Sequence, residues 1–353
     1  MSNHPLFSAY ITSLSFDCSL LVDCFGDFSS FSAFPECVIE FSTYRTLLKE
    51  QTDIITSTKD VRILEAAIPK FSNLQKVRLF VGNFRNGGPL LKTTVALVLH
   101  SSPGIDLHQA SVCSVRQFMK LMAILARHKI KLSVLKLELL TYAALDQDEE
   151  ALKPVREVFT SLENIGFHLS GTDDGLLPPS NRTSKYASYR APSVISNGKA
   201  VQLLSSATQL KNLSISTDEY LYELRASFRD FVGDCIWPRL TRLSMGSIRV
   251  AEDDLINFLC RHATLKELSI HSLTLTGSWL ALLPKIRETA SLERVNAYGY
   301  LRNHGPEYWY LGRHPDKKMV GRADESHLGL LVAYYLTTAP DGFACPLTLD
   351  NMP

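Results

Sequence analysis

The sequence lacks the features that define several large classes of protein. No apolar run reaches the roughly 18–20 residues that a membrane-spanning helix needs, and the mean hydropathy is +0.01. The 37 Lys and Arg residues are balanced by 36 Asp and Glu residues, so the formal net charge is only +1. Such a balance gives the whole chain no general attraction for polyanions or anionic lipid. The composition therefore predicts neither a nucleic-acid partner nor a membrane partner.

Cysteine is scarce and scattered. The seven cysteines include no C-x-x-C pair and no Cys/His cluster with metal-ligand spacing. Cys260 follows Leu259 on a predicted apolar helix face, where we expect a small core residue. The N-terminus has no basic segment leading into an apolar one. These observations predict no metal, no other cofactor and a reducing compartment, the cytoplasm or the nucleus.

Catalytic motifs are also missing. The sequence has no G-x-S-x-G, no phosphate-binding G-x-x-x-x-G-K-[ST], no G-x-G-x-x-G and no H-E-x-x-H. His262 and His271 follow predicted helix and strand ends, so we expect surface or capping histidines. The cluster of Asp146, Asp148, Glu149 and Glu150 is expected to be a solvated acidic loop before a helix at Ala151. The sequence therefore predicts a protein that is not an enzyme.

What the sequence does contain is one phrase that occurs eight times: an apolar residue, two free positions, an apolar residue, one free position and an apolar residue. A repeated L-x-x-L-x-L is typical of the strand of a leucine-rich repeat. The phrases are Ile11-Leu14-Phe16, Leu74-Val77-Leu79, Leu132-Leu135-Leu137, Leu162-Ile165-Phe167, Leu210-Leu213-Ile215, Leu240-Leu243-Met245, Leu265-Leu268-Ile270 and Leu292-Val295-Ala297.

Segments with helical spacing precede most of the phrases. Predicted helices begin near Asp60, Asn197, Asp253 or Asp254, and Ser278, and a longer one covers 112–126. Helices that alternate with strands require parallel strands joined by crossover helices. Several starts are only 25 to 30 residues apart, and the two longest intervals, 17–73 and 80–131, are expected to contain degenerate repeats or insertions.

We therefore predict an α/β fold of the irregular leucine-rich-repeat-like solenoid kind, a curved parallel sheet inside and helices outside. A doubly wound α/β domain is the alternative, but its strands would be continuous apolar runs. The solenoid is expected to cover residues 1–301, with a mobile insertion at about 170–199 that is rich in Ser, Gly, Pro, Asp and Asn. Residues 302–353, which include Tyr308 to Tyr310 and the apolar stretch 328–336, are expected to form a C-terminal cap.

The free positions of the strand phrases predict a protein-binding inner face. They alternate with the apolar residues, so they point away from the core, and they mix charges with aromatic side chains, as protein interfaces do. The candidate binding residues are Lys76, Arg78, Phe80, Lys136, His168, Arg242, His271, Arg294, Asn296 and Tyr298.

Several segments resemble the fungal F-box/leucine-rich-repeat-like proteins. They are 258–268 (FLCRHATLKEL), 275–279 (LTGSW), 4–14 (HPLFSAYITSL, similar to the strand after the F-box), 44–79 and 345–347 (CPL). The resemblance covers nearly the whole chain. It implies a substrate-recognition module whose repeats hold an unidentified target protein, while an F-box recruits a cullin-RING ubiquitin ligase through its adaptor.

Two features depart from that family. The F-box would precede His4, where only three residues stand, so the expected alternatives are a module that recruits a ligase through an upstream F-box and a scaffolding or degenerate fragment without ligase recruitment. The Asn or Cys that usually follows each phrase is also absent, so we expect irregular turns. The residues at those positions are Ser19, Gly82, Leu140, Ser170, Asp218, Ile248, Leu273 and Tyr300.

Overall fold

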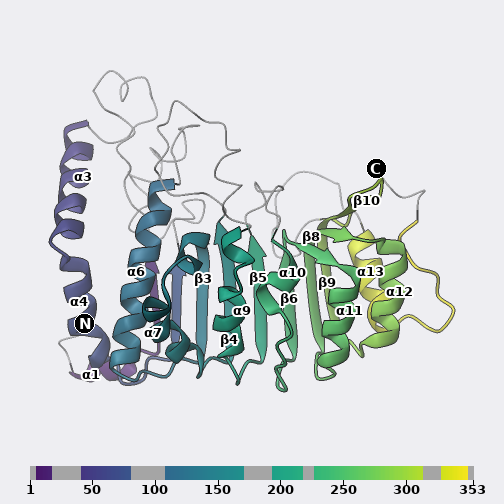
Figure 1. Ribbon diagram of the computed structural model, residues 1–353, viewed down its shortest axis with the longest axis horizontal. Helices are drawn as coiled ribbons and strands as arrows, with labels where there is room; N and C mark the ends of the chain where they lie inside the picture. Colours follow the sequence, from purple (N-terminus) through teal and green to yellow (C-terminus); the bar gives the residue numbers. More distant parts are fainter. Residues whose placement is uncertain are drawn as a thin grey trace.

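Parallel strands in chain order organise the structure. The computed structural model describes residues 5–17, 41–80, 108–170, 193–217, 226–312 and 327–348. In these residues the chain is mixed α/β, with one large, mostly parallel sheet whose two ends do not join (Figure 1). The predicted α/β class is confirmed. Most of the predicted insertion at about 170–199 lies outside the described residues.

Each of the eight repeated phrases has its second and third apolar residues on its own strand, and two further described strands, the short β7 (Arg249–Ala251) and β10 (Tyr308–Tyr310), contain no phrase. The strands of the phrases are β1 (Ser13–Asp17), β2 (Lys76–Phe80), β3 (Val134–Thr141), β4 (Asn164–Ser170), β5 (Asn212–Thr217), β6 (Arg242–Gly246), β8 (Glu267–Thr276) and β9 (Arg294–Asn303). Their order in the sheet is the order in the chain, except that β7 lies off this path and pairs with β8. All pairs are parallel except β9 with β10.

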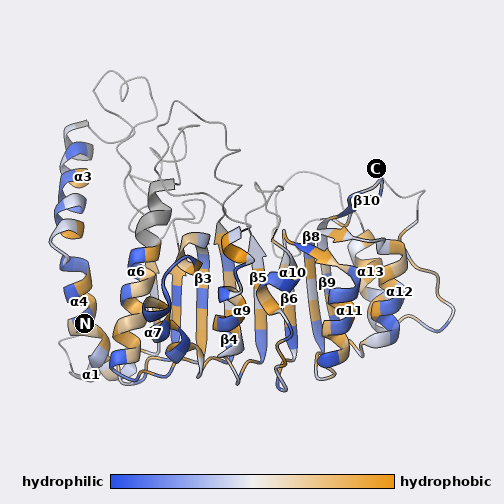
Figure 2. Cartoon of the chain, viewed as in Figure 1, coloured by the Kyte–Doolittle hydropathy of each residue, from blue (hydrophilic) through white to orange (hydrophobic). Residues whose placement is uncertain are grey.

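The phrases are aligned with one another across the sheet. The second apolar residues form one row of registered partners: Leu14, Val77, Leu135, Ile165, Leu213, Leu243, Leu268 and Val295. The third apolar residues form the next: Phe16, Leu79, Leu137, Phe167, Ile215, Met245, Ile270 and Ala297. From β2 to β8 both rows are buried, and each side chain contributes about 1.5–3 kcal/mol by leaving water. Figure 2 shows the alternation of apolar and polar residues along these strands.

Among the described residues, no strand of the sheet lies between β1 and β2 or between β2 and β3. β1 pairs directly with β2, and β2 pairs directly with β3. Degenerate repeats and insertions are the two alternatives expected in 17–73 and 80–131, and the direct pairing agrees with insertions, because the described residues add no strand to the sheet there. The described parts of these intervals contain helices instead: α3 (Phe41–Thr56), α4 (Lys59–Ala67), the short 3-10 helix Ile68–Lys70 and α6 (His108–Arg127).

Helices cover one face of the sheet. Besides those above, they are α1 (Pro5–Tyr10), a 3-10 turn (Tyr142–Leu145), α7 (Glu149–Phe159), α9 (Lys199–Ser205), α10 (Phe228–Val232), α11 (Glu252–Arg261), α12 (Trp279–Thr289) and α13 (Leu328–Thr337). Helices α6 to α12 lie along the same side of the strands (Figure 1). Their apolar stripes are buried against the two strand rows in one core, as amphipathic spacing requires.

The predicted helix start at Ser278 is confirmed, since Ser278 is the N-cap of α12, whereas the observed N-caps of α4, α9 and α11 differ from the predicted ones. Asp60, Asp253 and Asp254 lie in the first turns of α4 and α11, and the N-caps are Thr58 and Ala251. Acidic side chains there still favour the helix, because the N-terminal end of its dipole is positive.

Two local expectations are wrong. The segment 4–14, expected as a strand, contains the helix α1 before β1 starts at Ser13. Cys260 is exposed rather than in the core. His262 is the C-cap of α11, which is one of the two alternatives expected for it, and it is buried, with 2% of its surface exposed. Its ring stacks on Phe258 with centroids 4.0 Å apart, so its role is in the core.

The repeats on β6, β8 and β9 have a residue with positive φ at equivalent positions. Ser247, Ser272 and Gly299 each follow a third apolar residue by two positions, and each has a positive φ, of 51°, 49° and 74°. A Cβ on Gly299 would lie 2.5 Å from the Ser272 Oγ, so glycine suits this bulge. The turns expected to be irregular therefore share one backbone conformation at this end of the sheet.

The last described elements lie against β9. β10 pairs antiparallel with residues 300–302 of β9. Helix α13 packs closely against β9, because a Cβ on Gly329 would come within 2.2 Å of the Ala297 carbonyl oxygen. The predicted boundary between residues 301 and 302 falls inside β9. In the described parts of the chain, no helix has both the length and the apolar character needed to cross a bilayer.

Candidate functional site

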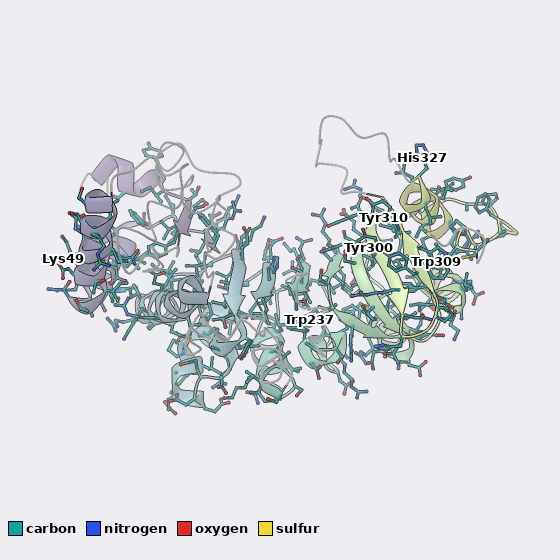
Figure 3. The ribbon with its side chains drawn as sticks, turned by 90° about the horizontal axis from the view of Figure 1, so that it is seen from above. Lys49, Trp237, Tyr300, Trp309, Tyr310 and His327 are labelled. Atoms are coloured by element: carbon teal, nitrogen blue, oxygen red, sulfur yellow. The ribbon has the colours of Figure 1, made fainter. Side chains whose placement is uncertain are left out.

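The residues that alternate with the buried rows form the second face of the sheet, which we call the open face. In β2, for example, Lys76 and Arg78 are exposed on either side of the buried Val77. Successive side chains of a strand point to opposite faces, so these residues point away from the helices. Seen from above, the chain follows an open curve with its helical layer on the outer side (Figure 3).

All of the predicted binding residues belong to strands and occupy the alternating positions of the open face. None of them is buried in the core. They do not form one cluster, however. Lys76, Arg78, Phe80 and Lys136 lie on β2 and β3, whereas Arg242, His271, Arg294, Asn296 and Tyr298 lie on β6, β8 and β9. Six strand spacings of about 4.8 Å separate β2 from β9, or about 29 Å.

The N-terminal group is held by contacts between neighbouring strands. The guanidinium of Arg78 donates to Glu138 at 2.6 Å and lies 5.2 Å from the centre of the Phe80 ring. The hydrogen bond to Glu138 raises the pKa of Arg78 above its ordinary value. Lys136 passes over Gly166, where a Cβ would be 3.5 Å from the lysine Cγ. Both cations thus lie along the sheet.

The middle of the open face carries small side chains. The registered row that begins with Arg78 and Lys136 continues through Gly166, Ser214, Ser244 and Ser269 to Asn296. His168, the remaining predicted residue, is half-buried on β4 and is the partner of Ser216. This row therefore carries no charged side chain between Lys136 on β3 and Asn296 on β9.

The C-terminal group contains an ion-pair triad. The carboxylate of Glu267 accepts from Arg242 at 2.7 Å and from Arg294 at 3.5 Å. The hydrogen bond from Arg242 is the main reason that the pKa of Glu267 is lowered. Both arginine side chains remain more than half exposed, so the pairs contribute only about 0–1 kcal/mol to stability and leave the guanidinium groups accessible.

His271 and Tyr298 form a stacked pair above this triad. Their rings are 4.9 Å apart and nearly parallel, at 3°. The imidazole also lies over Gly246, where a Cβ would be only 1.8 Å from the ring atoms. Glycine at position 246 therefore makes room for the histidine, which holds the tyrosine ring in place.

The sequence prediction missed a tyrosine cluster that continues from Tyr298. Tyr300 on β9 is the registered partner of Tyr310 on β10, and its ring lies 5.0 Å from that of Tyr310 and 5.4 Å from that of Tyr308. Trp309, between the two β10 tyrosines, is buried on the opposite side (Figure 3). The only sequence signal for this cluster was the run of three aromatic residues at 308–310, and such a run is compatible with a capping segment as well as with a strand.

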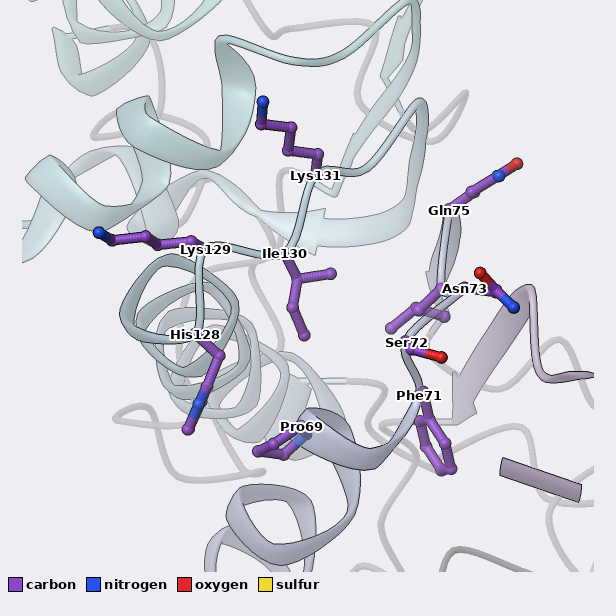
Figure 4. A pocket seen from close by; sticks show the side chains of 10 residues that line it. Pro69, Phe71, Ser72, Asn73, Gln75, His128, Lys129, Ile130 and Lys131 are labelled. Atoms are coloured by element: carbon purple, nitrogen blue, oxygen red, sulfur yellow. The ribbon is translucent and has the colours of Figure 1, made fainter. Parts of the chain in front are cut away.

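A pocket of about 450 Å³ lies elsewhere, at the edge where β2 and β3 begin (Figure 4). Its lining comes from the loops before these strands and includes Phe71, Asn73, His128, Lys129 and Lys131. It contains a histidine and a serine but no carboxylate or cysteine side chain.

Within the described ranges, no group of three or more His, Cys, Asp and Glu residues is placed to hold a metal ion. The sequence matches no protein-family model, and a search of curated proteins finds no significantly similar chain. The open face with its Arg, His and Tyr side chains is therefore the candidate functional site.

Proposed function

We propose that this chain is an irregular leucine-rich-repeat-like solenoid that binds a protein partner on the open face. The observation that carries the proposal is the C-terminal group, in which accessible arginines on β6 and β9 adjoin stacked aromatic rings. Arg and Tyr are enriched among the residues that dominate the binding energy of protein interfaces. The alignment of the phrases in one register supports the repeat architecture.

The resemblance to fungal F-box/leucine-rich-repeat-like proteins suggests the biological setting. In that setting the open face would hold the target of a ubiquitin ligase. Binding of a cullin-RING adaptor is a separate part of the proposal, because it requires an F-box. An in-frame F-box coding segment upstream of Met1 would support it.

Affinity capture with matched variants tests the binding proposal. The double variant Arg242→Ala with Arg294→Ala should reduce capture of the partner more than tenfold, since it removes two hot-spot side chains. The control is Arg127→Ala with Arg229→Ala. These arginines are 61% and 62% exposed, with carboxylates at 3.0 and 3.5 Å, but they lie on helices. Quantitative mass spectrometry should show a protein that is lost with the first variant and retained with the second.

The result that contradicts the proposal is equally specific. If every captured protein survives the open-face variant, or is lost equally with the helix variant, the open face is not the binding site. Capture that is lost only when 170–199 is deleted would assign binding to that segment. Melting temperatures of both variants should match the unmodified chain, because exposed ion pairs contribute little to stability.

A further inference from the structure

The C-terminal half of the open face has a charge that the whole chain does not have. The chain is nearly neutral, yet four arginines lie on this half: Arg242, Arg249, Arg294 and Arg302. The first and third belong to the triad with Glu267. Arg249 and Arg302 occupy one registered row through Thr274, beside the tyrosines. Among the described residues of strands β6 to β10, Glu267 is the only one with a carboxylate side chain.

Burial and hydrogen bonds place Arg249 and Arg302 on the open face. Val250 and Leu301, their neighbours in the chain, are 0% exposed, so the arginines point to the other side. The Nε of Arg302 donates to the Thr274 hydroxyl at 2.9 Å. Glu307, the acidic residue nearest to Arg302 in the sequence, accepts from the backbone N–H of Trp279 at the start of α12 at 2.8 Å.

Along β9, the open face presents its charged and aromatic side chains in a fixed order. The residues of β9 on the open face are Arg294, Asn296, Tyr298, Tyr300 and Arg302. At about 3.3 Å per residue the two arginines are about 26 Å apart along the strand. The tyrosine cluster fills the space between them. A ligand along β9 thus meets a cation, then aromatic surface, then a second cation.

Resting on the proposed function, we propose that the partner presents an extended acidic segment to this half of the open face. Its carboxylates pair with Arg242, Arg249, Arg294 and Arg302, and an apolar or aromatic side chain between them packs on the rings of Tyr298, Tyr300, Tyr308 and Tyr310. Carboxylates match the guanidinium fork. Glu267, at the centre of the lower group, disfavours the dense, regular charge of a polynucleotide.

A fluorescence anisotropy titration of the full chain tests this proposal. The probes are a labelled glutamate–tyrosine copolymer, a labelled lysine–tyrosine copolymer and a labelled single-stranded oligothymidine. The glutamate copolymer should bind at least tenfold more tightly than the other two, and its binding should weaken as salt rises. Tighter or equal binding of the oligothymidine would overturn the proposal in favour of a nucleic acid. Absence of binding to the glutamate copolymer would also overturn it.

Matched variants then locate the binding. Arg249→Glu with Arg294→Glu should weaken binding of the glutamate copolymer more than tenfold, whereas the helix variant Arg127→Glu with Arg229→Glu should leave it within twofold. Tyr300→Ser with Tyr308→Ser, both 38% exposed in the unmodified chain, should weaken it severalfold at unchanged salt dependence. Equal losses in the helix variant would show non-specific attraction and refute the proposed site.

The two proposals fail in different ways. If a partner is captured through Arg242 and Arg294 but the glutamate copolymer does not bind, the open face is a binding site and the partner is not acidic. If the copolymer binds at the arginines but no captured protein depends on them, the protein-binding function fails instead.

Discussion

Replacing His262 by alanine should destabilise the fold more than any other histidine substitution among the described residues. The backbone N–H of Trp237 donates to the His262 Nε2 at 3.0 Å, and the Nδ1 lies 2.8 Å from the Phe258 carbonyl oxygen. These contacts fix a neutral ring whose Nδ1 carries the proton. The ring also stacks on Phe258, with centroids 4.0 Å apart. One side chain thus connects α11 to the loop before β6.

The magnitude follows from three losses. A buried N–H without an acceptor costs about 1–3 kcal/mol. Loss of the stacked pair costs about 0.5–1.5 kcal/mol, and part of a ring-sized cavity remains. We expect His262→Ala to lower the free energy of unfolding by about 3–5 kcal/mol, given that contributions of contacting groups overlap. Urea unfolding followed by circular dichroism measures this change, and His128→Ala, at an exposed histidine, should change it by less than about 0.5 kcal/mol.

The same histidine makes stability depend on pH. Burial lowers the pKa of His262 below the ordinary value of 6.5. Above pH 6.5 both the folded and the unfolded states hold it neutral, so its full contribution is present. As the pH falls below 6.5, the unfolded chain binds a proton that the folded chain does not, and the free energy of unfolding falls by up to about 1.4 kcal/mol per pH unit until the folded-state pKa is reached. The difference between the unmodified chain and His262→Ala should therefore shrink below pH 6.5. A difference that stays constant from pH 7.5 to 5 would refute a neutral, buried His262.

Three further predictions concern the sheet and its open face. Leu268→Ala, in the buried second row, should cost about 2–5 kcal/mol of unfolding free energy, whereas Ser269→Ala on the open face should stay within about 0.5 kcal/mol; equal effects in thermal melts would contradict the assignment of faces. Gly246→Ala should displace His271, whose ring atoms would be 1.8 Å from the new Cβ, and so weaken partner capture severalfold, while Gly166→Ala, with its nearest atom at 3.5 Å, should leave capture unchanged; intact capture by the first variant would mean that the His271–Tyr298 stack does not contribute to binding. Residues 1–205 expressed alone should be poorly folded or aggregate, because the cut removes β5 and exposes the edge and core of the repeat on β4; a cooperatively melting fragment would indicate two domains.

Much of the strand layer could be predicted from the sequence because its signal is local and repeated. The phrase places apolar residues two apart, so each occurrence specifies a strand and the side of it that is buried. Residues such as Arg78, Arg242 and Tyr298 could then be assigned to the open face by alternation alone. The sequence could not show that β1, β2 and β3 are direct neighbours, because the length of an interval does not distinguish an insertion from a degenerate repeat.

The sequence by itself thus determined the parallel strands, their buried rows and the residues of the open face, since period-two alternation is a property of the backbone. Only the tertiary structure decided which of these residues meet. The triad around Glu267 depends on the registered neighbours β6, β8 and β9. The tyrosine cluster depends on β10 folding back antiparallel to β9, and His262 became a core residue because Trp237 comes to it from 25 positions earlier in the chain. Such contacts join residues far apart in sequence, and no local pattern encodes their pairing.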